Sequence, residues 1–105
     1  MDIPLTKDAE KLVAAAYKRY LEKRKSGVSK ALAKRISVEE IQPVYFSDLT
    51  REDYLETVAE MCRALGCTMF FGGAFLLNDL SIVYMENRFQ NGLKDTLGFL
   101  AQFIP

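Results

Sequence analysis

The sequence predicts a mostly α-helical fold with a small antiparallel β-hairpin, which is an α+β class. Apolar residues recur every three or four positions along several stretches, as on one face of a helix. A glycine pair at 72–73 separates two short apolar runs, as in a tight hairpin. The chain has 105 residues, of which 50% are hydrophobic, so one domain spanning 1–105 is expected.

The first helix is expected at residues 7–25. Thr6 can cap its N-terminus, and Ser26-Gly27 provides a C-terminal break. One apolar face is expected to contain Ala9, Leu12, Val13, Ala16, Tyr17, Tyr20 and Leu21. This face predicts that the helix packs on the core along its whole length.

A short second helix is expected at 30–35, with Ser29 as its cap. Pro43 then argues against a regular helix, because proline lacks the backbone N–H and clashes with the preceding turn, so at most a short turn at 38–41 is expected. The third helix is expected at 51–65.

The third helix has a signal at each end. Thr50 starts a sequence that resembles a capping box, and Gly66 suits the left-handed residue that ends many helices. The solvent face of this helix is expected to contain Asp53, Glu56, Thr57, Glu60 and Arg63.

The hairpin is expected at 67–77, with Gly72-Gly73 as a two-residue loop. That loop pairs Phe71 with Ala74 and Phe70 with Phe75, and it makes both faces of the hairpin apolar. A last helix is expected at 79–103. If unbroken it would be about 37 Å long, so it must overhang, bend at Gly92 or Gly98, or pack against another chain.

Several segments carry a family resemblance: "VSKALAKRI" as a second helix, "TREDYLETVAEMCRALGC" as a third, and "FFGGAFLLNDLSIVYMENRF" as a hairpin and following helix. In this order they resemble the winged helix-turn-helix superfamily, here with a long C-terminal helix. More narrowly, "AYKRYLEKRKSGVSKALAKRI" and "YMENRFQNGLKDTLGFLAQFIP" are similar to small uncharacterised prophage proteins of the YjcQ-like kind. The resemblance implies that the third helix and the hairpin, or wing, contact DNA, and that the "GVS" at 27–29 could add an edge strand.

Charge is distributed unevenly although the net charge is zero. Residues 18–35 carry +7 and residues 36–60 carry −6. Two interpretations remain open: solvated helix faces that neutralise each other, or an anion-binding surface. The expected DNA-recognition helix is rich in carboxylates and the wing has no Lys or Arg, so double-stranded DNA is expected to contact the basic segment instead. The candidate nucleic-acid-binding residues are Lys23, Arg24, Lys25, Ser29, Lys30, Lys34 and Arg35.

The apolar hairpin and C-terminal helix predict a second kind of surface. A homodimer would cover both, although a bent helix that folds back over the hairpin would do the same within one chain. The candidate dimer residues are Phe70, Phe75, Leu77, Phe89, Leu93, Leu97, Leu100 and Phe103.

Catalysis is not expected, because the chain has no histidine, the commonest general base. Two cysteines alone cannot complete a zinc site, and no nucleotide-binding motif occurs, so no metal, cofactor or small-molecule ligand is expected. No apolar segment is long enough to span a membrane and no secretory signal is recognised, which favours a cytoplasmic protein. The sequence therefore predicts a DNA-associated or regulatory accessory protein of prophage type, with a protein-interaction or dimerisation module as the alternative.

Overall fold

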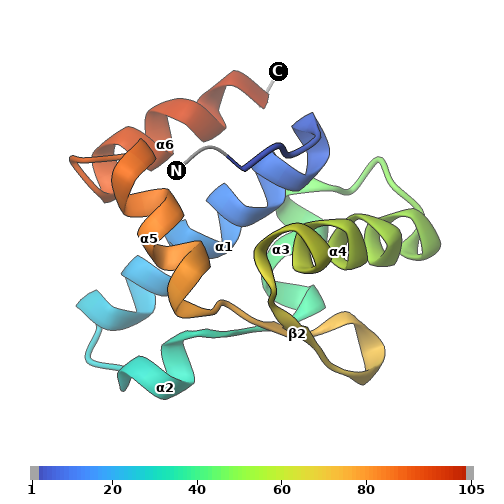
Figure 1. Cartoon of the computed structure of the whole chain (residues 1–105), viewed down its shortest axis with the longest axis horizontal. Helices are drawn as coiled ribbons and strands as arrows, with labels where there is room; N and C mark the ends of the chain where they lie inside the picture. Colours follow the sequence, from blue (N-terminus) through green and yellow to red (C-terminus); the bar gives the residue numbers. More distant parts are fainter. Residues whose placement is uncertain (1–2, 104–105) are drawn as a thin grey trace.

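A computed structural model describes residues 3–103, with helix α1 (Lys7–Lys25) running through the middle of the fold (Figure 1). Thr6 caps α1 as predicted, because its hydroxyl accepts a hydrogen bond from the backbone N–H of Ala9. The helix is buried on more than the one predicted face, since the alanines at 14–16 are all buried. Small side chains at these positions allow neighbouring helices to approach α1 from several sides.

The segment that follows α1 differs from the prediction. Helix α2 (Lys30–Ala33) is shorter than expected, and Arg35–Ile36 forms strand β1, so the third strand does not come from "GVS" at 27–29. Helix α3 (Val38–Tyr45) then continues through Pro43, which corrects the expected turn at 38–41. Because Pro43 lies close to the end of α3, its missing N–H removes only one backbone hydrogen bond and few residues must continue beyond it.

Helix α4 (Arg51–Leu65) is confirmed with both of its signals. The Thr50 hydroxyl accepts a hydrogen bond from the backbone N–H of Asp53, and Gly66 ends the helix with φ of +72°. The expected solvent face was wrong at Thr57, which is buried and donates its hydroxyl to the carbonyl of Asp53.

Strands β2 (Thr68–Met69) and β3 (Phe75–Leu76) form the hairpin, and β1 pairs with the other side of β3, giving the antiparallel order β1-β3-β2. The expected register was wrong by one residue: Met69 faces Phe75 and Thr68 faces Leu76. Residues 71–73 form a three-residue loop in which Gly72 and Gly73 both have positive φ. A slip of one residue exchanges the two faces of a strand, and β2 is exposed throughout.

The C-terminal segment is two helices and not the single helix expected at 79–103. Helix α5 (Asp79–Arg88) and helix α6 (Leu93–Leu100), which continues into η2 (Ala101–Phe103), are separated by a break at Gly92, where φ is +60° and ψ is −121°. Positive φ strongly favours glycine there. Asn78 caps α5 as predicted, by accepting a hydrogen bond from the backbone N–H of Ser81.

The helices surround α1. Contacts join α1 to α2, α3, α4, α5 and α6, so the buried residues form one hydrophobic cluster around it (Figure 1). The Cα radius of gyration is 12.6 Å, which the break at Gly92 makes possible. Within residues 3–103, no helix combines the length and the apolar character that crossing a membrane requires.

Candidate nucleic-acid interface

The C-terminal end of α1, helix α2 and strand β1 meet at one end of the molecule. They carry five of the seven predicted nucleic-acid-binding residues, and the other two, Ser29 and Lys34, are the caps on either side of α2. The Lys23 ammonium donates a hydrogen bond to the backbone carbonyl of Arg35 at 2.6 Å, which joins α1 to β1. The backbone carbonyl of Lys34 accepts from the N–H of Leu77 at 2.8 Å, which joins the same segment to β3. The predicted residues are therefore neighbours, but they have different roles.

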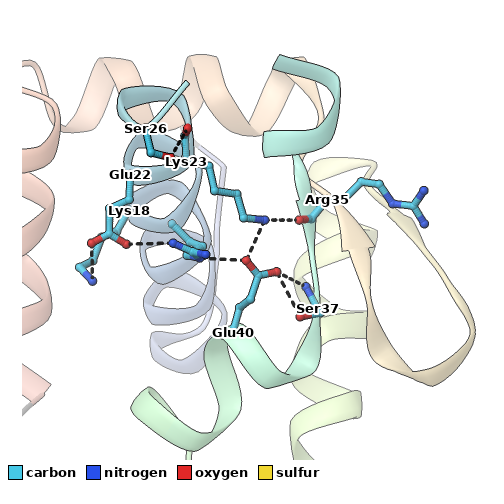
Figure 2. Close-up of polar contacts among 8 residues, drawn as sticks. Lys18, Glu22, Lys23, Ser26, Arg35, Ser37 and Glu40 are labelled. Atoms are coloured by element: carbon cyan, nitrogen blue, oxygen red, sulfur yellow. Dashed lines mark hydrogen bonds and ion pairs between the residues drawn. The ribbon is translucent and has the colours of Figure 1, made fainter. Parts of the chain in front are cut away.

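Glu40 on α3 binds two of the cations that the sequence places in the basic segment. Its Oε1 lies 2.7 Å from Lys23 Nζ and 2.9 Å from Arg19 Nε. Its Oε2 accepts the backbone N–H of Ser37 at 2.8 Å and the Ser37 hydroxyl at 3.1 Å (Figure 2). Partial burial raises the pKa of Glu40, but the bonds from Lys23, Ser37 and Arg19 outweigh it and hold the pKa below the usual value.

This arrangement gives Lys23 a structural role; we use "framework" for the cations held in this way by contacts within the chain. Its side chain is only 12% exposed, and its ammonium already contacts Glu40 and the Arg35 carbonyl. A lysine held in this way cannot reach a phosphate without breaking both contacts. Lys18 and Arg19 also lie within ion-pair distance of Glu22, at 3.3 Å and 3.9 Å (Figure 2).

Lys34 is held by a different carboxylate. Its ammonium lies 2.7 Å from Asp79 Oδ1 at the start of α5, and the lysine side chain is 18% exposed. The hydrogen bond and charge of Lys34 lower the pKa of Asp79, and the charge of nearby Lys30 adds to the effect. The pair joins the end of α2 to the start of α5, so the Lys34 ammonium already has a carboxylate partner.

Four of the predicted cations remain exposed and form no ion pair within residues 3–103; we call them the basic end: Arg24, Lys25, Lys30 and Arg35. Arg24 donates to the backbone carbonyl of Val28, which leaves its charge uncompensated. Arg35 lies over the Phe70 ring, 5.1 Å from the centroid, and its side chain extends away from the Glu40 network (Figure 2). These four side chains can still meet an anion.

Ser29 acts as a helix cap. Its hydroxyl accepts a hydrogen bond from the backbone N–H of Leu32 at 3.3 Å. Helix α2 has four residues, so it contributes little dipole for an anion seat at its N-terminus. Ser29 therefore positions Lys30, and nothing in its contacts indicates direct anion binding.

The α4–hairpin region has a different chemistry; it comprises the exposed side chains Arg51, Glu52, Asp53, Glu56, Arg63, Met69 and Phe71. Its charged members are three carboxylates and two guanidinium groups, and Arg63 lies 3.6 Å from Glu56. Phe71 is fully exposed at the tip of the hairpin, while Met69 is 38% exposed. No lysine or arginine occurs between residues 67 and 80. This region offers an apolar tip and negative charge.

The candidate dimer residues fall into three groups. Phe75, Leu77, Phe89 and Leu100 are buried inside this chain. Phe70 and Leu93 are half-buried, and only Leu97 and Phe103 count as exposed. Packing within one chain therefore already covers most of these residues, with α6 against α1 and the buried residues in one hydrophobic cluster.

Two residues that organise this end of the molecule, Glu40 and Asp79, were missed by the sequence reasoning. Ser37-x-x-Glu40 has the spacing of a capping box and could have revealed Glu40. The partnership of Asp79 with Lys34 connects positions 45 residues apart and has no local signal.

The fold and the candidate interface define a small α+β domain with an electropositive end. Comparison of the chain with protein-family models, curated proteins and solved structures finds no match. The function is therefore argued from the surfaces of the molecule.

Proposed function

We propose that this chain is a DNA-associated accessory protein of the winged-helix type, which contacts the phosphate backbone through its basic end. The observation that carries the proposal is the set of four exposed cations without carboxylate partners, Arg24, Lys25, Lys30 and Arg35. Lysine and arginine contacts to phosphate supply nearly all sequence-independent affinity for DNA. Binding of this kind positions a protein on the duplex and reads no sequence.

The arrangement of elements supports the winged-helix part of the proposal. Helices α3 and α4 are consecutive, a hairpin follows them, and β1, which precedes the pair, completes the sheet beside β3. In the proposed mode, α4 does not enter the major groove, because its exposed carboxylates would lie against phosphates. The basic end then provides the contact surface.

Salt dependence is the direct test of the proposal. If all four cations meet phosphates, the logarithm of the association constant should fall against the logarithm of salt with a slope of about −3.6. Affinity for a short duplex should then drop roughly a hundredfold between about 50 and 200 mM salt. Fluorescence anisotropy with a labelled duplex of arbitrary sequence measures this. No binding even at the lowest salt would overturn the proposal.

A charge-matched variant separates a defined surface from general charge attraction. Lys25→Gln with Lys30→Gln should reduce the magnitude of the slope by about two. Lys7→Gln with Lys94→Gln removes the same charge from exposed positions outside the basic end. Lys7 and Lys25 are at opposite ends of α1, about 27 Å apart. Equal losses in the two variants would argue against a defined interface.

A second candidate function is a protein-interaction module that uses the hairpin tip. The observation that favours it is Phe71, a large apolar side chain that is fully exposed in a loop without basic residues. Exposed aromatic residues are over-represented among the anchors of protein interfaces.

Phe71→Ala distinguishes the two candidates. Since Phe71 packs against nothing that the mutation would uncover, the free energy of unfolding should change by less than about 0.5 kcal/mol, and DNA affinity should be unchanged if the basic end is the interface. Urea denaturation and the anisotropy assay measure the two effects. A clear loss of DNA binding would instead place the hairpin tip in the DNA contact.

A further inference from the structure

The two cysteines lie together at the C-terminal end of α4, in a geometry set by its cap. Gly66 adopts left-handed angles, and the backbone N–H of Cys67 donates to the carbonyl of Cys62 at 3.0 Å. This bond, from a residue to the carbonyl five positions earlier, is the mark of a Schellman cap, which brings the side chains of its first and last members into contact. The Cys62 and Cys67 side chains accordingly lie close enough to change each other's pKa.

The N-terminal end of the ten-residue helix α5 lies beside Cys67. The Cys67 Sγ lies 3.1 Å from the Ser81 hydroxyl, and its thiol donates to Asn78 Oδ1 at 3.5 Å. The interaction with Cys62 is the main cause that lowers the pKa of Cys67, to about 6, with help from Ser81 and the backbone of Asn78 and against the effect of burial. The same interaction raises the pKa of Cys62, as does burial.

Solvent exposure also favours Cys67 as the first of the two thiols to react. The residue Cys62 is only 6% exposed and faces the core, whereas Cys67 is half-buried. An oxidant in solution therefore reaches Cys67 first, and Cys62 lies next to it.

We propose that Cys62 and Cys67 form a reversible oxidation site for small-molecule disulfides, in which Cys67 is the attacking thiol and Cys62 the resolving thiol. The Cys67 thiolate attacks one sulfur of the disulfide, forms a mixed disulfide and expels the other half as a thiolate. That thiolate takes up the proton that Cys67 had lost. The Cys62 thiol then gives its proton to solvent, and its sulfur attacks Cys67 Sγ.

The second step expels the other half of the small disulfide as a thiolate, which recovers a proton from solvent. The protein thereby loses two protons and two electrons, which together are two hydrogen atoms, and one small-molecule disulfide becomes two thiols. The product is a Cys62–Cys67 disulfide across the end of α4. Its formation depends on neither the basic end nor DNA.

The test is oxidation of the full-length reduced chain by glutathione disulfide, followed by alkylation with N-ethylmaleimide and measurement of the intact mass. The expected product has lost two hydrogen atoms, carries no maleimide and no glutathione, and returns to the dithiol form with dithiothreitol. A chain that remains reduced, that keeps glutathione on Cys67, or that forms disulfide-linked dimers would overturn the proposal.

Two variants test the assigned order. Cys62→Ser removes the resolving thiol, so a stable glutathione adduct should accumulate on Cys67. Cys67→Ser leaves only the buried thiol and should form this adduct at least tenfold more slowly. Circular dichroism establishes that each variant is folded. If either is not, acid quenching of the wild-type reaction and peptide mapping take its place: early glutathione on Cys67 supports the order, and early glutathione on Cys62 contradicts it.

Discussion

The basic end and the α4–hairpin region differ in how their charges are used. Around the basic end, Glu40 and Asp79 hold Lys23 and Lys34 within the framework, while four other cations remain exposed. On the α4–hairpin region the exposed charge is mostly negative, and the hairpin tip is apolar. The four exposed cations therefore lie on α1, α2 and β1 and not on α4, although Arg35 borders the hairpin through Phe70.

This difference shows that a run of basic residues is not by itself a binding surface. Lys23 and Arg24 are adjacent in the sequence, yet Lys23 is fixed by Glu40 and Arg24 keeps an uncompensated charge. A buried or half-buried cation needs a partner because desolvation is costly. Carboxylates of the same chain pair with the less exposed cations. Only the cations that remain exposed and unpaired can bind a ligand.

The largest effect is expected at Gly73, where the hairpin loop packs against the rest of the fold. Gly73 has φ of +91°, and a Cβ there would lie 2.9 Å from Val38 Cγ2 and closer still to Leu55 Cδ2. Gly73→Ala combines a strained backbone with a clash and should lower the free energy of unfolding by about 3 to 5 kcal/mol. Urea denaturation measures this.

Gly72→Ala is the matched control, since Gly72 also has positive φ, of +86°, but its Cβ would meet nothing within 4 Å. Backbone strain alone should cost about 1 to 2 kcal/mol. Similar losses in the two variants would contradict the close packing of the loop on α3 and α4.

A smaller effect is expected at Glu40, which tests whether Lys23 belongs to the framework. Glu40→Gln keeps an acceptor for the Ser37 N–H but removes the charge that faces Lys23 and Arg19. The loss should be about 1 to 2 kcal/mol. Glu22→Gln, at a more exposed carboxylate, should cost less than about 0.5 kcal/mol. Equal losses would mean that the network contributes no more than a surface ion pair.

The contribution of Glu40 should also depend on pH. Its pKa is lower in the folded chain than in the unfolded chain, so it stabilises the fold fully above the unfolded value of about 4.3. This contribution is lost as the pH falls through the folded-state pKa. The stability difference between wild type and Glu40→Gln should therefore shrink from neutral pH to about pH 3, as followed by urea denaturation. A constant difference would contradict the lowered pKa.

Local signals predicted the ends of the long helices. Thr6, Thr50, Gly66 and Asn78 act at the positions the sequence indicated, because caps depend on neighbouring residues alone. The hairpin register was wrong because it depends on tertiary packing: Gly73 lies against Leu55 and Val38, and this contact favours the three-residue loop. Of the alternatives left open for the C-terminal segment, the structure has the break at Gly92, and α6 then packs on α1.

The candidate site was predicted as a set of residues but not as a set of roles. All seven residues meet at one end of the molecule, as their sequence proximity suggested. Their division into framework and exposed cations depends on Glu40 and Asp79. Glu40 lies on α3, a helix that was not expected because of Pro43, and Asp79 is far away in the sequence. Such long-range charge pairing has no signature in one sequence.

DNA affinity of two double variants tests the central claim most directly. Lys25→Gln with Lys30→Gln removes two charges from the basic end, and Arg51→Gln with Arg63→Gln removes two from the α4–hairpin region. At low salt, we expect the first pair to weaken binding to a short duplex at least tenfold and the second to leave it within about twofold. If the second pair abolishes binding and the first does not, DNA is bound by α4 and the hairpin, and the account is wrong.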